Sequence, residues 1–306
     1  MRPRSEKVAN FCARWDSSVP EVAISRAVYA SFPELRKMSP PIDLFAIARS
    51  RDIRIVAADM EYDGILSRSK AGSYLIELNS ERRETRKRFT IAHELGHVLF
   101  LDEEEPSGEP GVRLRERQTH LPEVDVEEER LCDLAAAEIL MPTRQFSERL
   151  QRALGSPARL PETASLSPDF SARRRPRTPK AETILSLKRD FNTSLRATAR
   201  RVVDVLRTEK IAAGLWEYNH SLNAFENRWL EGASSSARNR LGIGPEQPIY
   251  RALCEGKPFM GYRWFSLGGP IQDYLVEGFP LGRGRMLLVI IFRKRQRSPG
   301  HRQSAA

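Results

Sequence analysis

The sequence predicts an α+β protein in which a helix-rich first part is followed by a strand-rich C-terminal part. Apolar residues recur at helical spacing in several stretches before Ala213. Short β-branched runs at 53–58 and 73–79 are typical of strands. From 213 to 295 the pattern changes to strands, turns and scattered aromatic residues. With 306 residues, the chain is long enough for two or three modules, each with its own core.

The first segment contains two predicted helices and two predicted strands. Residues 21–32 (EVAISRAVYASF) carry apolar side chains at helical spacing. Residues 40–52 (PPIDLFAIARSRD) begin with prolines and place Asp43 near the first helical turn. The two strands follow, and the pair Asp63-Gly64 predicts a turn between them.

Three helices and one charged loop are predicted next. The helices are expected at 80–101, 126–140 and 143–154, and the loop at 102–125. Either Asn79 or Ser80 can cap the first of these helices through its side-chain oxygen. The second helix is expected to stop where Met141-Pro142 interrupts the apolar pattern.

Changes in composition predict the domain organisation. Residues 154–180 combine turn and charged residues with little periodicity, which indicates a linker or surface insertion. Two helical patterns then surround Asn192-Thr193, and Ser194 is placed to cap the second. The predicted parts are a first domain at 1–153, the linker at 154–180, a helical unit at 181–207, a C-terminal α+β domain at 208–296 and a disordered tail at 297–306.

The overall composition, 40% hydrophobic and 29% charged, is typical of a soluble globular protein. No run is apolar and long enough to span a bilayer, and the N-terminus lacks the apolar centre of a secretory signal. The three cysteines, Cys12, Cys132 and Cys254, are too widely spaced for a disulfide framework or a CxxC metal knuckle. We therefore expect a cytoplasmic protein without membrane contact. Its net charge of +10 permits contact with nucleic acid but does not establish it.

The stretch RFTIAHELGHVLF at 88–100 carries two histidines four residues apart, with a glutamate directly after the first. Residues at this spacing share one face of a helix, so His93 and His97 can direct their imidazole nitrogens at one ion. Zinc binds histidine nitrogen readily. The offset of Glu94 lets its carboxylate reach a water beside the metal instead of the metal itself. The alternative interpretation is an ordinary amphipathic helix that happens to contain two histidines.

A catalytic zinc site needs a third protein ligand. A third histidine six residues after the second is absent, because a glutamate stands there. The helix predicted at 126–140 offers Glu129, with Asp133 on the same face to hydrogen-bond the outer nitrogen of a ligand histidine. Glu127 and Glu128 are interpreted as solvated residues at a helix start, where the helix dipole favours them. His120, in the predicted loop, is the alternative ligand.

Three segments resemble the ImmA/IrrE family of bacterial metallopeptidases: PPIDLFAIARSRDIRIV, RKRFTIAHELGHVLF and EEERLCDLAAAEILMP. The resemblance covers residues 40–150 and implies a zincin-like peptidase domain with a small, mostly antiparallel sheet. It implies His93, His97 and Glu129 as zinc ligands and Glu94 as the catalytic acid and base.

The resemblance also implies a strand beside the active site that pairs with an extended substrate, and GSYLIELN at 72–79 is the expected strand. The chain departs from the family at Cys132 and Asp133, where the family tends to have alanine and asparagine. Neither departure removes a ligand. For Cys132, a small buried side chain is favoured over a redox role.

Residues 181–206 look like the helix-turn-helix-like unit that follows the peptidase in the IrrE branch of the family. Its basic side chains can meet phosphates; they are Lys188, Arg189, Arg196, Arg200 and Arg201. We favour the alternative, a helical hairpin that packs against the peptidase. The aromatic residues of the C-terminal part suggest either a sensor pocket or, as we favour, a buried core; they are Trp216, Tyr218, Trp229, Tyr262, Trp264 and Phe265.

The hypothesis from sequence is a zinc-dependent endopeptidase, in which manganese can replace zinc because the same ligand types accept it. His120, Tyr74 and the arginines of 113–117 are candidates for a second group that stabilises the oxyanion. By resemblance, the protein substrate is a helix-turn-helix repressor of the phage type, whose cleavage switches on stress-response or mobile-element genes. The alternatives are a DNA- or protein-binding transcriptional regulator with a structural metal site, and a component of a toxin–antitoxin pair.

Overall fold

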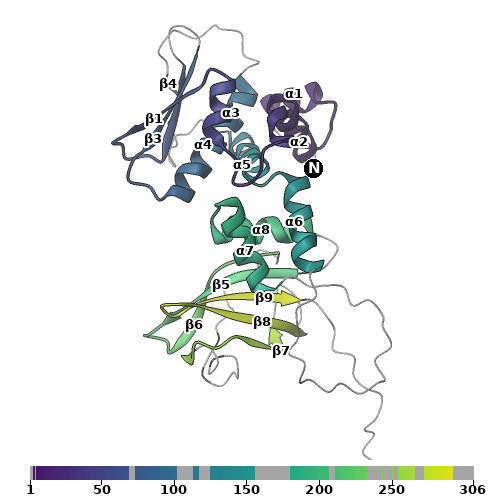
Figure 1. Ribbon diagram of the computed structural model, residues 1–306, viewed down its shortest axis with the longest axis vertical. Coiled ribbons are helices and arrows are strands. Elements are labelled where there is room, and N and C mark those ends of the chain that lie inside the picture. The colour runs from purple at the N-terminus through teal and green to yellow at the C-terminus, as the bar shows by residue number, and fades with distance from the viewer. Residues whose placement is uncertain are drawn as a thin grey trace, which may run out of the picture. The chain divides into compact units, whose positions relative to one another are not determined.

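The computed structural model describes most of the chain, and Figure 1 shows it as a ribbon. The described residues are 3, 5–68, 73–101, 113–116, 125–155, 180–206, 211–232, 243, 245, 250, 254–265 and 272–291. At 101, 113–116, 260–265, 272–273 and 291 the description covers the backbone alone. Most of the predicted linker, the predicted tail and His120 lie outside these ranges.

The chain divides into two compact units. The first contains residues 1–148 and 187–197, and the second contains residues 149–186 and 198–306. Helices occur together with two β-sheets, which confirms the predicted α+β class. The domain boundaries proposed from composition stay predictions.

Each helix in the first part of unit one begins at a capping side chain or at a proline. They are α1 (Glu6–Arg14), α2 (Pro20–Ser31), the short 3₁₀ helix η1 (Pro33–Arg36) and α3 (Leu44–Ser50). The Asp43 side chain accepts a hydrogen bond from the Ala46 N–H at 2.9 Å, as its place in the sequence predicts. A proline opens α2, where its fixed φ suits the first turn. The predicted helices at 21–32 and 40–52 are therefore confirmed, the second over a shorter range.

The first sheet has four strands in the order β1-β3-β2-β4. The strands are β1 (Arg54–Ala58), β2 (Gly64–Arg68), β3 (Tyr74–Asn79) and β4 (Arg113–Glu116). β1 and β3 pair in parallel, whereas β2 pairs antiparallel with both β3 and β4, so the sheet is mostly antiparallel as predicted. Two strands differ from the sequence prediction: β2 begins at Gly64 itself, and β4 lies in the segment predicted as a loop. Neither short segment has a strong strand pattern, and pairing with neighbouring strands supplies the backbone hydrogen bonds that define them.

The expectation that 72–79 pairs with an extended substrate is wrong. β3 is hydrogen-bonded to β1 on one side and to β2 on the other, so it is an internal strand. A strand with two neighbours has no free backbone edge for a third chain. The edge strands of this sheet are β1 and β4.

Two long helices form the centre of unit one. α4 (Glu84–Leu101) begins later than predicted, because the Asn79 side chain accepts from the Glu81 N–H at 2.9 Å and forms a turn ahead of the helix. α5 (Val126–Leu140) has the predicted bounds. Its cap is Asp125, whose carboxylate accepts from the backbone N–H groups of Glu127 and Glu128.

A glycine allows α4 and α5 to approach closely. A Cβ atom at Gly96 would lie 3.1 Å from the Cβ of Ala135 and 3.1 Å from the Cα of Cys132. These distances are shorter than ordinary contacts between carbon atoms. The absence of a side chain at this position therefore brings the face of α4 with the two histidines against α5.

We expect Gly96→Val to lower the free energy of unfolding by about 1–3 kcal/mol, because the branched side chain would push the two helices apart. The comparison is Lys87→Val, which introduces the same side chain on α4 at a partly exposed position. Urea titrations followed by tryptophan fluorescence would measure both. Equal unfolding midpoints for the two variants would contradict the close packing of α4 on α5.

Helices α6 (Thr143–Gly155), α7 (Ala181–Phe191) and α8 (Leu195–Val205) follow. Within unit one, the Phe146 and Phe191 rings lie 5.2 Å apart and the Thr193 hydroxyl donates to the Met141 sulfur at 3.8 Å. The Ser194 hydroxyl accepts from the Ala197 N–H at 3.1 Å, as predicted for a cap. Residues 187–197, the part of the two helices that belongs to unit one, therefore contact α6 and the residue that ends α5. The helical hairpin favoured from sequence stays a prediction.

The second unit contains a five-stranded antiparallel sheet in the order β6-β5-β9-β8-β7 (Figure 1). The strands are β5 (Ile211–Asn219), β6 (Ala224–Glu231), β7 (Phe259–Phe265), β8 (Gln272–Gly282) and β9 (Arg285–Ile291). Trp216 is fully buried in its core, and Tyr218 packs against that core, as expected of core aromatics. Phe259 at the start of β7 also packs against this core, whereas the side chains of Tyr262, Trp264 and Phe265 lie outside the description. In the described ranges, no helix has both the length and the apolar character needed to cross a membrane.

Candidate metal centre

Helix α4 presents both histidines of the HExxH stretch on its buried side. Every side chain from Thr90 to Phe100 is buried, because this part of α4 lies between the sheet and α5. His93 and His97 are one helical turn apart, and their rings meet edge to face with centroids 4.8 Å apart. This places their two Nε2 atoms 3.0 Å from each other.

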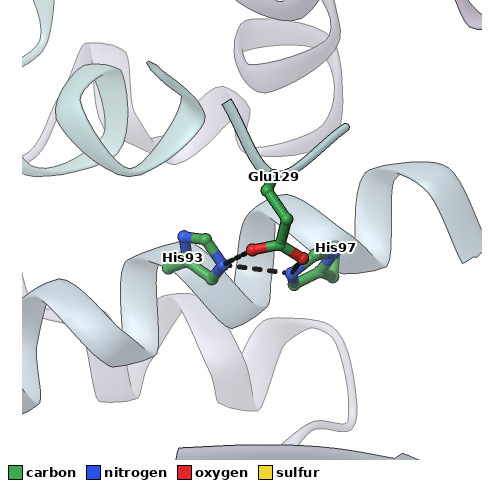
Figure 2. A group of neighbouring side chains, drawn as sticks. All are labelled: His93, His97 and Glu129. Carbon is green, nitrogen blue, oxygen red and sulfur yellow. Dashed lines mark hydrogen bonds and ion pairs between the residues drawn. The ribbon is translucent and has the colours of Figure 1, made fainter. Parts of the chain in front are cut away.

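Glu129 completes a triangle of potential ligand atoms (Figure 2). Its two carboxylate oxygens lie 3.2 Å from the Nε2 of His93 and 3.3 Å from the Nε2 of His97. Atoms that bind a tetrahedral zinc ion lie roughly 3.3–3.5 Å from one another. The two nitrogens and the carboxylate therefore fit one face of a zinc site. Since they form only three corners, a fourth position remains for water or substrate.

The outer nitrogen of His93 is held by a carboxylate on α5. Asp133 Oδ1 lies 2.9 Å from His93 Nδ1, at the position expected from the sequence. An acceptor at Nδ1 keeps the hydrogen on that nitrogen and leaves the lone pair of Nε2 for a metal.

The outer nitrogen of His97 has two partners that the sequence prediction missed. Glu128 Oε1 and Cys132 Sγ each lie 3.2 Å from His97 Nδ1, and both side chains are fully buried. The interpretation of Glu128 as a solvated residue is therefore wrong, because its side chain faces α4. A signal was present in the sequence: Glu128 and Cys132 have the same four-residue spacing as Glu129 and Asp133.

The charges in the cluster depend on one another. Burial by itself would raise the pKa of Glu129, but hydrogen bonds and positive charge from the two histidines hold that pKa far below its ordinary value. Burial by itself would lower the pKa of His97, yet Cys132 and the two glutamates raise it well above the usual value. Burial raises the pKa of the Cys132 thiol, with only partial opposition from His97. The cluster thus concentrates negative charge around two imidazoles, as a cation site requires.

Three further residues proposed from sequence have different outcomes. Glu94 lies on the same buried turn of α4, 2% exposed, between the two histidines. Tyr74 lies on β3, where the Arg68 guanidinium is 5.7 Å from the centre of its ring. His120 lies outside the described residues. Oxyanion roles for Tyr74 and His120 stay predictions.

The three cysteines are expected to differ in reactivity. Cys12 and Cys132 are buried and burial raises the pKa of both thiols, whereas Cys254 is exposed. Mass spectrometry after brief treatment with iodoacetamide should find one modified cysteine, Cys254, in the folded protein. Treatment in denaturant should modify all three. Rapid modification of Cys132 in the folded protein would contradict its burial beside His97.

The fold and the site together define a class: a helix with HExxH beside a small sheet, completed by a glutamate from a second helix, as in metallopeptidases. The sequence model of the IrrE N-terminal-like domain, a peptidase family, matches residues 48–202, which are 155 of the 306 residues. The chain therefore belongs to this family, and the resemblance to the ImmA/IrrE peptidases is confirmed.

Two known proteins are similar to the chain. The radiation response metalloprotease IrrE of Deinococcus radiodurans is 36% identical over 83 residues, which cover 26% of this chain but only 22% of that protein. A solved structure described as a Mycobacterium tuberculosis transcriptional regulator covers 94% of this chain and 80% of its own, with 13% identity and a TM-score of 0.49. A structural likeness at this level says nothing about function.

Proposed function

We propose that this chain is a zinc-dependent endopeptidase. The observation that carries the proposal is the triangle formed by the Nε2 atoms of His93 and His97 and the Glu129 carboxylate, with distances of 3.0 to 3.3 Å. A structural zinc site tends to use four protein ligands, whereas three ligands beside a buried glutamate are typical of catalysis. Membership of a peptidase family supports the same conclusion.

Each residue of the site has a separate proposed role in metal binding or proton transfer. His93, His97 and Glu129 would hold the ion, with Asp133 orienting the first histidine. Zinc, when bound, acidifies water and polarises the peptide carbonyl group. Glu94 accepts the proton of the attacking water and passes it to the nitrogen of the leaving amine. Manganese suits the same nitrogen and carboxylate ligands.

For the substrate, we propose a helix-turn-helix repressor of the phage type, cut at one site to relieve repression. This part rests on the resemblance to ImmA/IrrE peptidases. It agrees with the description of the Deinococcus radiodurans relative as a radiation response metalloprotease. The protein would then act as a switch for stress-response or mobile-element genes. Contact of the α7–α8 hairpin with nucleic acid is not needed for this function.

The test is to incubate the full chain, loaded with zinc, with purified repressors of this type. Intact-mass spectrometry should show two fragments that sum to one substrate cut at a single bond. A chelator should stop the reaction and added zinc should restore it. If the purified protein takes up no zinc or manganese even on reconstitution, the proposal is wrong. Binding of metal and repressor without cleavage would favour a regulator with a structural metal site.

A further inference from the structure

Glu128 is a buried carboxylate that the three-ligand site does not use. Its side chain is fully buried at the third position of α5. One oxygen lies 3.2 Å from Nδ1 of His97, and the other lies 3.4 Å from Nζ of Lys7. A single carboxylate thus connects a candidate metal ligand with a lysine of α1.

A buried carboxylate needs compensating partners, because removal from water costs several kcal/mol when its charge is unpaired. The N-terminus of α5 and the His97 N–H supply part of this compensation. Lys7 brings a full positive charge to Glu128 from outside the histidine cluster. The Lys7 side chain is 30% exposed.

The position of Lys7 is set by further contacts of α1. The backbone N–H of Ser5 donates to Glu127 at 2.9 Å, and the Ser5 hydroxyl donates to Asp125. One helical turn after Lys7, the Phe11 ring stacks on Phe100 at the end of α4, with centroids 4.2 Å apart. α1 therefore contacts both helices that carry the candidate ligands.

We propose that Lys7 and Glu128 are positioning residues for the metal centre, so that helix α1 contributes to metal binding through Lys7. The inference rests on the proposed function. Glu128 accepts the hydrogen of His97 Nδ1, which orients the ring and directs the Nε2 lone pair at the ion. Lys7 holds the carboxylate in place and compensates its charge. The family model covers residues 48–202, so the contribution of Lys7 comes from a part of the chain outside the matched domain.

Cys132 is the weaker of the two partners of His97 Nδ1. A thiol is a poor hydrogen-bond acceptor compared with a carboxylate at the same distance. One N–H group donates best to the carboxylate, which makes Glu128 the partner that sets the orientation of the ring.

The test measures affinity for Zn²⁺ and the visible absorption of bound Co²⁺ in the full chain, after removal of metal by a chelator. Glu128→Leu removes the acceptor with little change in volume, and should weaken binding about 10- to 100-fold. Lys7→Met should weaken it several-fold and alter the Co²⁺ spectrum. Glu128→Gln keeps an acceptor oxygen and should recover part of the affinity. Lys37→Met and Glu148→Gln, at exposed or partly exposed positions, are the matched controls and should bind like wild type.

The coupling between the two residues gives the decisive comparison. Lys7→Met should have no further effect in the Glu128→Gln background, because the charge that the lysine compensates is then absent. The inference would be overturned if the losses of metal affinity in the two single variants added up in the double variant. It would also be overturned if folded Lys7→Met and Glu128→Gln both had the metal affinity and the Co²⁺ spectrum of the wild type. Circular dichroism would show whether each variant is folded. If Glu128→Leu does not fold, the metal affinities of Glu128→Gln and Lys7→Met test the inference. If the wild type shows no metal binding that is lost in His93→Ala, the proposed function is wrong. If the wild type binds metal in this way but substitutions at Lys7 and Glu128 leave the affinity unchanged, only this inference is wrong.

Discussion

Replacement of Glu94 by glutamine is expected to lower the rate of peptide cleavage by about 10³-fold while the protein keeps its metal. The amide has nearly the same shape as the carboxylate, but it cannot accept the proton of the attacking water. Since Glu94 lies on the buried turn between His93 and His97, the substitution leaves the three candidate ligands in place. The rate would be measured on the repressor identified by the cleavage screen, and the metal content by atomic emission.

The cleavage rate and the metal content together distinguish an enzyme from a regulator with a structural metal site. A regulator with a structural metal site would be unchanged in metal content and would show no cleavage to lose. If Glu94→Gln cleaved at the wild-type rate, Glu94 could not be the acid and base. If it lost its metal, Glu94 would have to be counted among the residues that hold the ion.

Glu129→Ala is expected to reduce the affinity for zinc by more than about 10²-fold, because it removes one of three protein ligands. The binding free energy of zinc in such protein sites is roughly 10 kcal/mol or more, so one ligand accounts for a large share of it. The loss of Glu129 also leaves His93 and His97 without the carboxylate that lies 3.2 and 3.3 Å from their Nε2 atoms. Zinc content after dialysis should fall from about one per chain, the value expected of one site, to nearly none. The matched control is Glu148→Ala, where the side chain is 49% exposed on α6.

Thermal unfolding provides a second measurement of the same loss. A ligand that binds only the folded state stabilises it, by about 2.7 kcal/mol when its concentration is one hundred times the dissociation constant. Added zinc should therefore raise the melting temperature of the wild type and of Glu148→Ala, but not of Glu129→Ala. A zinc-dependent shift of equal size in all three proteins would show that Glu129 is not a ligand.

Features that depend on neighbouring residues in the chain could be predicted from the sequence. The bounds of α5 follow from Asp125 before its first turn and from Met141-Pro142 after its last. The caps of α3 and α8, Asp43 and Ser194, are local as well, because a side-chain oxygen bonds a backbone N–H two or three residues away. The spacing of His93 and His97 places both on one face of any helix that contains them.

Features that depend on pairing between distant segments were missed or assigned incorrectly. β4 pairs with β2, about fifty residues earlier, and its sequence Arg-Leu-Arg-Glu has the composition of a charged loop. The internal place of β3 follows from its two partners, β1 and β2, and not from its own residues. Strand order is a property of the assembled sheet, so no local pattern could show that β3 lacks a free edge.

The sequence by itself determined the types of residue available for a metal centre: two histidines one turn apart, a glutamate between them, and a later helix rich in carboxylates. Only the tertiary structure decided which carboxylate meets which nitrogen. The missing side chain at Gly96 lets α5 lie close to α4, and in this packing Glu129 meets the Nε2 atoms whereas Glu128 meets the Nδ1 of His97. Neighbours in sequence on a helix point about 100° apart, so adjacent glutamates acquire different partners once the helices pack. The same packing brings Lys7 of the N-terminal helix to Glu128, a contact over more than one hundred residues that no spacing in the sequence indicates.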